Sequence, residues 1–186
     1  MIIGVTGIFG SGKSTVACLL KKKGFMHINA DTIGHALLQK PGMRKKVVHE
    51  FGKGIISGNR IDRSKLKQIV FHDPSQLKRL NRIMHPAIIR EIENIIGKNK
   101  DKDIVLDAPL LIELKAHHLV DKILVVKIKK SVQLQRLGKK KKYTQSEIKN
   151  IMKSQLSQKE KLKYADIVID NSGTMIQTQK QMEAMR

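Results

Sequence analysis

A chain of 186 residues, 40% of them hydrophobic, fits one domain or one compact domain with small inserted subdomains, and we expect no second independent domain. No segment approaches the roughly 20 apolar residues of a membrane-spanning helix, so we expect a cytoplasmic protein without a membrane partner. The net charge of +21 favours phosphate-bearing ligands, but the absence of Trp and the presence of only four Phe and two Tyr argue against a nucleic-acid stacking surface.

The predicted elements alternate short β-branched runs with amphipathic segments, a pattern that favours a mainly parallel sheet covered by helices. The predicted strands are residues 2–6, 25–28, 104–107, 123–128 and 167–170. Between the first two lies a predicted helix that opens near Gly12 and stops at Gly24, because glycine is common just past a helix end. The sequence therefore predicts an α/β fold with a five-stranded, mainly parallel sheet.

The strongest motif lies between the first strand and the first helix. It reads Gly7-Ile8-Phe9-Gly10-Ser11-Gly12-Lys13-Ser14-Thr15 and satisfies the P-loop pattern GxxxxGK(S/T). The glycines let backbone N–H groups point inward, Lys13 reaches the β- and γ-phosphates, and Ser14 is expected to bind Mg²⁺. The predicted ATP-binding residues are Gly10, Ser11, Gly12, Lys13, Ser14 and Thr15. A glycine-rich turn without a ligand is the alternative, and the motif indicates a nucleoside triphosphate without indicating a particular reaction.

Two aspartates follow predicted strands, at the sheet edge where ligands of open α/β sheets bind. Asp31 comes just after the second strand and could accept the proton of a hydroxyl that attacks the γ-phosphate. It could equally cap a helix over residues 32–38. Asp107 ends the third strand, where a carboxylate can hold Mg²⁺ or its water shell, or can simply end the strand and cap a turn.

A stretch from about residue 42 to residue 97 separates the second and third predicted strands and contains no convincing strand. Its predicted helical segments are residues 65–71, 76–84 and 87–96. Asp73 followed by Pro74 is typical of a capped helix start, and Gly97 is typical of a helix end. We interpret the stretch as a helical insertion within a single domain.

A basic segment at about residues 136–160 has the composition of a lid over a bound triphosphate. It contains Arg136 and the lysine run 139–142, followed by a capping-box pair, Thr144 and Glu147, that predicts a helix to about residue 163. Cationic groups in a lid would stabilise charge on the transferred phosphoryl group. The alternative is a solvated lysine loop, and for any single lysine of the run that alternative is favoured.

Several short segments together carry a resemblance to a known family. They are Gly4-Val5-Thr6-Gly7 through Lys13-Ser14-Thr15, Asn29-Ala30-Asp31, Leu66 through Val70-Phe71, His85-Pro86, Pro109-Leu110-Leu111-Ile112-Glu113 and Ala165-Asp166-Ile167-Val168-Ile169-Asp170-Asn171. With them, the chain resembles the dephospho-coenzyme A kinase family over nearly its whole length. The resemblance implies transfer of phosphate from ATP to the ribose 3′-hydroxyl of dephospho-coenzyme A, the last step of coenzyme A biosynthesis.

The same resemblance implies a three-layer P-loop kinase fold similar to that of nucleoside monophosphate kinases, in which the helical insertion binds the acceptor. The residues it implies for catalysis are Lys13, Asp31 as the base, Arg136 and Lys140. Those implied for substrate binding are Asp31, His85, Pro86, Pro109 and Leu110, with Asn171 near the adenine and Ser14 and Asp107 at Mg²⁺. A proline-opened helix at His85 and a plain turn at Asn171 are the structural alternatives.

The chain departs from the family pattern at three places, one of which, Ile8 in place of a common glycine, falls at a permissive position of the P-loop motif. Asn29 stands where a first acid is usual, and Lys140 with Lys141 stands where the lid usually has an Arg-Asp pair. Lysine lacks the planar fork with which arginine binds phosphate in a bidentate manner. The alternative functions are another small-molecule kinase of the nucleoside monophosphate type or, in a different class, a nucleotide-gated nucleic-acid-binding protein. We predict no specific nucleic-acid partner and favour a monomer.

Overall fold

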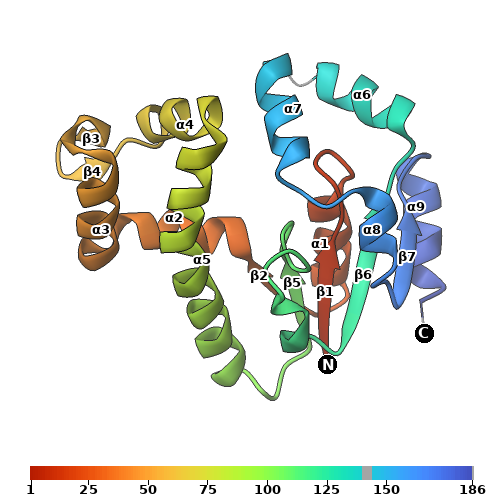
Figure 1. The fold of residues 1–186 in the computed structure, drawn as a ribbon. Helices are drawn as coiled ribbons and strands as arrows, with labels where there is room; N and C mark the ends of the chain where they lie inside the picture. Colours follow the sequence, from red (N-terminus) through yellow and green to blue (C-terminus); the bar gives the residue numbers. More distant parts are fainter. Residues whose placement is uncertain (140–143, 186) are drawn as a thin grey trace. The chain divides into compact units, whose positions relative to one another are not determined.

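The fold comes from a computed structural model that describes residues 1–139 and 144–185. The chain divides into two compact units (Figure 1), one comprising Met1–Asn29 and Ile96–Arg186 and the other Ala30–Ile95. The second unit starts earlier than the insertion predicted at about residues 42–97. The reason is that helix α2 (Ala30–Gln39) packs against α3 (Pro41–Phe51) and contributes Leu37 and Leu38 to the core of that unit.

The first unit is built on a five-stranded parallel sheet. Its strands are β1 (Ile2–Thr6), β2 (Met26–Asn29), β5 (Ile104–Asp107), β6 (Lys122–Lys127) and β7 (Ile167–Asp170), in the order β2-β5-β1-β6-β7. All four pairings are parallel. The five predicted strands are confirmed, with β2 and β6 each displaced by one residue from the prediction. Because β1 is central, its carboxyl end leads into the glycine-rich segment in the middle of the sheet edge.

Helices α1 (Lys13–Lys22) and α9 (Met175–Glu183) contact each other and pack on one face of this sheet. They share one apolar core with the strands, made of Ile3, Val5, Val16, Ala17, Leu20, Val105, Leu124, Val126, Ile169 and Met182. On the opposite face, the segment after β5 lies close to β1, since a Cβ built on Gly4 would come within 2.6 Å of Leu111. The sheet is therefore covered on both faces, as buried parallel strands require.

The helices that follow β6 are α6 (Lys130–Lys139), α7 (Gln145–Lys153) and α8 (Gln158–Leu162). The capping box of Thr144 and Glu147 is present at the start of α7, as predicted. The prediction of one helix to about residue 163 is wrong, because α7 ends at Lys153 and a second cap, the Ser157 hydroxyl, accepts from the Glu160 N–H to begin α8. A short 3-10 turn, Ala116–Leu119, lies between β5 and β6.

The second unit contains α2, α3, a 3-10 turn (Lys53–Ile55), α4 (Arg63–His72) and most of α5 (Pro74–Gly97). Its core consists of Leu37, Leu38, Val47, Ile55, Ile61, Leu66, Val70 and Met84. The prediction that this stretch has no strand is wrong, because β3 (Ile56–Ser57) and β4 (Arg60–Ile61) form a small antiparallel hairpin. Two residues per strand are too few to produce a recognisable alternating pattern.

The long helix α5 corrects a second expectation about this unit. It begins at Pro74 as predicted, with the Asp73 carboxylate accepting the Ser75 N–H at 2.8 Å. Pro86 does not open a new helix but lies inside α5. Apolar side chains on both sides of it, Met84 and Ile88, pack on the same core, and this packing offsets the backbone hydrogen bond that proline cannot donate. Within the described residues, no helix is both long enough and apolar enough to cross a membrane.

Candidate active site

The glycine-rich segment forms a tight loop between β1 and α1. Gly10 and Gly12 have positive φ angles of 79° and 91°, a backbone conformation that residues with a Cβ adopt with strain. Gly12 is the N-cap of α1 and has no side chain that could cap the first turn. A Cβ at Gly12 would also overlap the amide nitrogen of Asn171. No side chain therefore caps this helix start, and an uncapped helix N-terminus is the kind of site that binds an anion such as phosphate.

Lys13 lies at the beginning of α1 and is buried, with 8% of its surface exposed. Its ammonium folds back over the loop and donates a hydrogen bond to the Ile8 carbonyl at 3.2 Å. The hydroxyl-bearing residues that follow differ in exposure, since Ser14 is exposed and Thr15 is half-buried. The loop therefore has a cation held against its own backbone and an exposed hydroxyl at the helix start, which are the kinds of group that hold a triphosphate and its metal ion.

Asn171 lies directly behind this loop, just after β7. Its amide nitrogen donates to the Ser11 carbonyl at 2.8 Å, and its amide oxygen accepts from the Thr178 hydroxyl of α9 at 2.9 Å. The residue is buried, so it braces the loop from the protein side. These bonds give the side chain a structural role, while the contact with adenine that the family resemblance implies stays a prediction.

Two glutamines from distant parts of the chain bind the backbone of Phe9 in the loop. Gln133 of α6 donates to the Phe9 carbonyl at 2.6 Å, and the Phe9 N–H donates to the Gln155 side-chain oxygen at 2.9 Å. Gln133 is almost fully buried, at 1% exposure. Sequence reasoning missed both residues, because glutamines in amphipathic segments look like ordinary surface positions and nothing local indicates their distant partner.

Arg136 lies one turn beyond Gln133 on α6 and is half-buried. Its guanidinium donates to the Gly173 carbonyl at 3.1 Å, which holds the side chain near the turn between β7 and α9. Lys140, the other predicted lid cation, lies outside the described residues. The role of both cations in charge stabilisation stays a prediction.

Asp107 is buried at the carboxyl end of β5, in register with Val5 of β1 and Asn29 of β2. Its carboxylate accepts from the Asn29 side-chain amide at 3.1 Å, and the His27 Nε2 atom lies 3.9 Å away. An acid at position 29 would place a second negative charge against Asp107, and two adjacent carboxylates cannot both ionise easily. The amide of Asn29 instead donates a hydrogen bond to Asp107 and adds no second charge.

Asp31 is the second residue of α2 and belongs to the second unit. The alternative interpretation as an N-cap is wrong, because the helix begins at Ala30 and Asp31 lies within its first turn. A carboxylate in that turn is stabilised by the helix dipole. The side chain is exposed, and within the described residues no group is hydrogen-bonded to it or ion-paired with it. The carboxylate is therefore available to a ligand.

The predicted acceptor-binding residues lie in both units. His85 is half-buried on α5, and burial lowers the pKa of its imidazole below the ordinary value, while Pro86 beside it is exposed. Pro109 and Leu110 follow β5 in the first unit and are half-buried. The Pro109 carbonyl is already used, because it accepts from the Thr6 hydroxyl at 3.1 Å and from the Lys161 ammonium at 2.8 Å.

A buried ion pair joins α8 to the segment after β5. Lys161 has no exposed surface, and its ammonium is 2.7 Å from Glu113, which is 15% exposed. Burial lowers the pKa of Lys161, and the hydrogen bond and charge of Glu113 oppose that effect. Glu113 also accepts the Leu156 N–H at 2.9 Å, next to Gln155. The pair therefore connects the end of β1, the segment after β5 and the turn that binds Phe9.

Comparison with known proteins shows which family has this sequence. A family model described as dephospho-CoA kinase matches residues 1–177. The chain belongs to the dephospho-CoA kinase family. A dephospho-CoA kinase from Fusobacterium nucleatum is 41% identical over 184 residues, which cover 98% of this chain and 95% of that protein. This result confirms the resemblance drawn from the sequence segments.

Solved structures agree with the family assignment. The crystal structure of TT1252 from Thermus thermophilus has a TM-score of 0.81 at 28% identity, covering 99% of this chain and 95% of that one. A dephospho-CoA kinase from Campylobacter jejuni has a TM-score of 0.69 at 29% identity, covering 97% of this chain and 92% of that one. The α/β P-loop kinase fold predicted from the sequence is thus confirmed.

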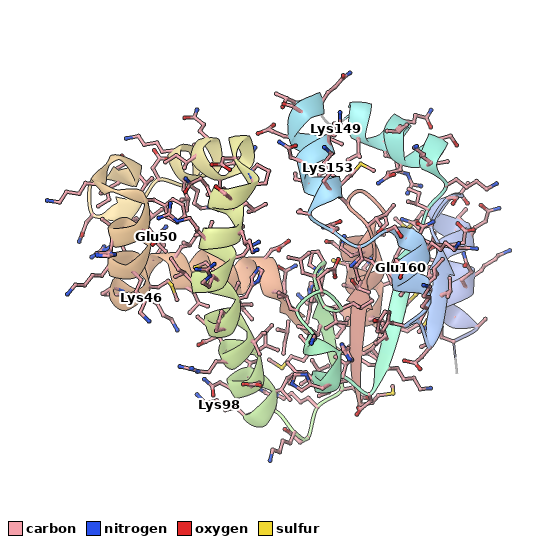
Figure 2. The ribbon with its side chains drawn as sticks, viewed as in Figure 1. Lys46, Glu50, Lys98, Lys149, Lys153 and Glu160 are labelled. Atoms are coloured by element: carbon pink, nitrogen blue, oxygen red, sulfur yellow. The ribbon has the colours of Figure 1, made fainter. Side chains whose placement is uncertain are left out.

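The net positive charge of this family member is spread over many elements. Lys46 on α3, Lys98 after α5 and Lys149 on α7 are all exposed and come from separate parts of the chain (Figure 2). By contrast, the buried lysines of the described residues are Lys13 and Lys161, both in the first unit. The bulk charge is therefore a general surface property, whereas these two lysines are placed by specific contacts.

Proposed function

We propose that this chain transfers the γ-phosphate of ATP to the 3′-hydroxyl of the dephospho-CoA ribose and so produces CoA. The observation that carries the proposal is the loop with Gly10 and Gly12 at positive φ and the Lys13 ammonium folded over it, in a chain whose family is dephospho-CoA kinase. Phosphoryl transfer requires mainly positioning and charge stabilisation, and such a loop supplies both.

The chain's own groups have distinct roles in this proposal. Residues Gly10–Thr15 hold the phosphates, and Lys13 stabilises the charge that develops on the transferred group. The exposed carboxylate of Asp31 accepts the proton of the ribose hydroxyl as its oxygen attacks phosphorus. Arg136 and Lys140 supply further positive charge from the lid.

Two oxygen-bearing side chains at this edge of the sheet have the chemistry that Mg²⁺ prefers. Ser14 offers an exposed hydroxyl at the start of α1, and Asp107 offers a carboxylate at the end of β5. Within the described residues, no cluster of three or more His, Cys, Asp or Glu side chains could hold a metal alone. That agrees with an ion held by one or two protein oxygens and the phosphates of the substrate. When bound, Mg²⁺ would neutralise charge on those phosphates.

A substrate panel tests the proposal. The purified chain is incubated with ATP, Mg²⁺ and either dephospho-CoA or a set of nucleoside monophosphates, and the phosphorylated product is identified by mass and by the position of the new phosphate. We expect turnover on dephospho-CoA, with the phosphate at the 3′ position. Turnover confined to the monophosphates would overturn the substrate assignment while leaving the chain a kinase.

A further inference from the structure

The P-loop is held at Phe9 by two side chains that lie far away in the sequence. Gln133 is 124 residues from Phe9 and Gln155 is 146 residues from it. One binds the carbonyl and the other the N–H of the same residue, so both peptide groups of Phe9 are fixed from outside the loop. The adjacent Gly10 is also covered from α6, since a Cβ there would lie 3.1 Å from Leu137.

The two glutamines are themselves held in place. Gln133 lies on the buried side of α6, in the same helix as Leu137. Gln155 lies between α7 and α8, and the N–H of the next residue, Leu156, donates to Glu113 of the buried ion pair. Both amides therefore extend from anchored backbone, and the loop conformation depends on α6 and on the α7–α8 turn.

We propose that Gln133 and Gln155 are positioning residues for ATP. They fix the peptide groups of Phe9 and thereby keep the loop in the conformation that holds the phosphates, although neither need touch the nucleotide. This inference rests on the proposed kinase function, in which the loop is the phosphate cradle. It assigns to two glutamines, outside the P-loop motif, part of the chain's affinity for ATP.

The two hydrogen bonds have opposite polarity, and this makes the inference sharply testable. The Phe9 carbonyl can only accept, so Gln133 must present its NH₂ group, whereas the Phe9 N–H can only donate, so Gln155 must present its oxygen. Glutamate keeps the size of glutamine and the acceptor but loses the donor. The same change, glutamine to glutamate, should therefore break the bond at Gln133 and preserve it at Gln155.

The experiment measures ATP affinity by isothermal titration calorimetry without an acceptor, together with the KM for ATP, kcat and Tm, for Gln133→Glu and Gln155→Glu. Gln135→Glu is the control, because this exposed residue lies on the same helix as Gln133 and the change adds the same charge. We expect Gln133→Glu to weaken ATP binding about tenfold and Gln155→Glu no more than about twofold, each relative to the control. The loss should appear mainly in the KM for ATP rather than in kcat.

A second pair, Gln133→Met and Gln155→Met, keeps the test decisive if the glutamate at position 133 prevents folding. Each methionine removes one bond to Phe9 without adding charge, and each should weaken ATP binding about fivefold. Equal effects of the two glutamate variants, a larger effect of Gln155→Glu, or wild-type ATP affinity in either methionine variant would overturn the inference. A purely structural role would lower Tm and leave ATP affinity unchanged.

These measurements separate the inference from the function on which it rests. If the wild-type chain bound ATP but did not phosphorylate dephospho-CoA, the proposed substrate would be refuted. The ATP affinities of the glutamine variants would still decide whether Gln133 and Gln155 position the loop.

Discussion

Replacing Glu113 with Gln should destabilise the protein more than replacing Lys161 with Met. In the wild-type chain the Glu113 carboxylate accepts hydrogen bonds from the Lys161 ammonium and from the Leu156 N–H. A glutamine amide has one acceptor atom, so whichever way it is turned its NH₂ group faces one of these donors. Lys161 has no exposed surface and would then be a buried ammonium without a negative partner.

The expected magnitudes differ because only one of the two changes leaves a charge buried. Removing one partner of a buried ion pair costs about 3–5 kcal/mol when the other charge stays behind. Lys161→Met removes the buried charge itself and leaves Glu113, which is 15% exposed and keeps its bond to the Leu156 N–H. The lost hydrogen bonds of Lys161 then cost about 1–3 kcal/mol. A difference of about 2 kcal/mol corresponds to roughly 4–8 °C in Tm for a chain of this size.

Urea unfolding at pH 7 and Tm measurements on Glu113→Gln, Lys161→Met and the double variant Glu113→Leu/Lys161→Met decide the matter. The double variant should be more stable than Glu113→Gln, since it buries no charge.

The pH dependence of stability gives a second check. Without Glu113, burial alone acts on the pKa of Lys161 and lowers it further below the unfolded value. Between the pKa of Lys161 in the folded variant and its pKa in the unfolded chain, the unfolded state binds more protons, so the stability of Glu113→Gln rises with pH. The stability that this variant loses relative to the wild type should therefore shrink toward alkaline pH. A Lys161→Met variant as unstable as Glu113→Gln, or a deficit that grows with pH, would refute this reasoning.

The remaining predictions concern the phosphate loop and the two candidate site residues of the second unit. Lys13→Ala should abolish useful turnover, while Lys22→Ala, an exposed control on the same helix, should not; kcat and the KM for ATP measure this. Gly12→Ala should lower stability by at least about 1–2 kcal/mol and prevent ATP binding, because its φ is 91° and the new Cβ displaces Asn171; urea unfolding and calorimetry would show it. Asp31→Asn should reduce kcat by about 10²–10³ with unchanged ATP affinity and a Tm no more than about 4 °C lower, from the lost interaction with the helix dipole, and a wild-type rate would exclude Asp31 as the base. Burial lowers the pKa of His85, so the unfolded state takes up its proton first as pH falls below about 6.5 and stability declines there; His85→Gln should flatten the dependence of the unfolding free energy on pH over that range.

The parts of the fold that were predicted correctly are those whose signal is local. The strands β1, β5 and β7 are short apolar runs bounded by turn residues, and the loop at Gly12 is specified by glycines in one continuous motif. Capping at Asp73 and Thr144 likewise depends on residues within one helical turn. Each of these features can be recognised from neighbours in the sequence, because the hydrogen bonds that create it are short-range.

The features that the sequence did not predict depend on partners elsewhere in the chain. Pro86 continues a helix because apolar residues on both sides of it meet one core. Lys161 lies in a lysine-rich stretch that resembles a solvent-exposed helix. Its buried ammonium depends on partners far away in the sequence, Glu113 and the Pro109 carbonyl. Lys163, two residues further along the same stretch, is exposed, so the neighbouring sequence does not indicate which of the two lysines is buried.

The same distinction explains how the phosphate site is built. The motif supplies the groups that would contact ATP, but side chains outside it fix their positions: Asn171 at Ser11, and Gln133 with Gln155 at Phe9. All three bind backbone atoms of the loop, so their effect does not depend on the side chains that the loop itself carries. A loop with three glycines at positive φ has many conformations available when unsupported, and each bond to its backbone removes some of them. Pre-organisation of this kind lowers the entropic cost of binding. ATP affinity should therefore be sensitive to changes in α6, in the α7–α8 turn and after β7, even where those changes leave every residue of the motif intact.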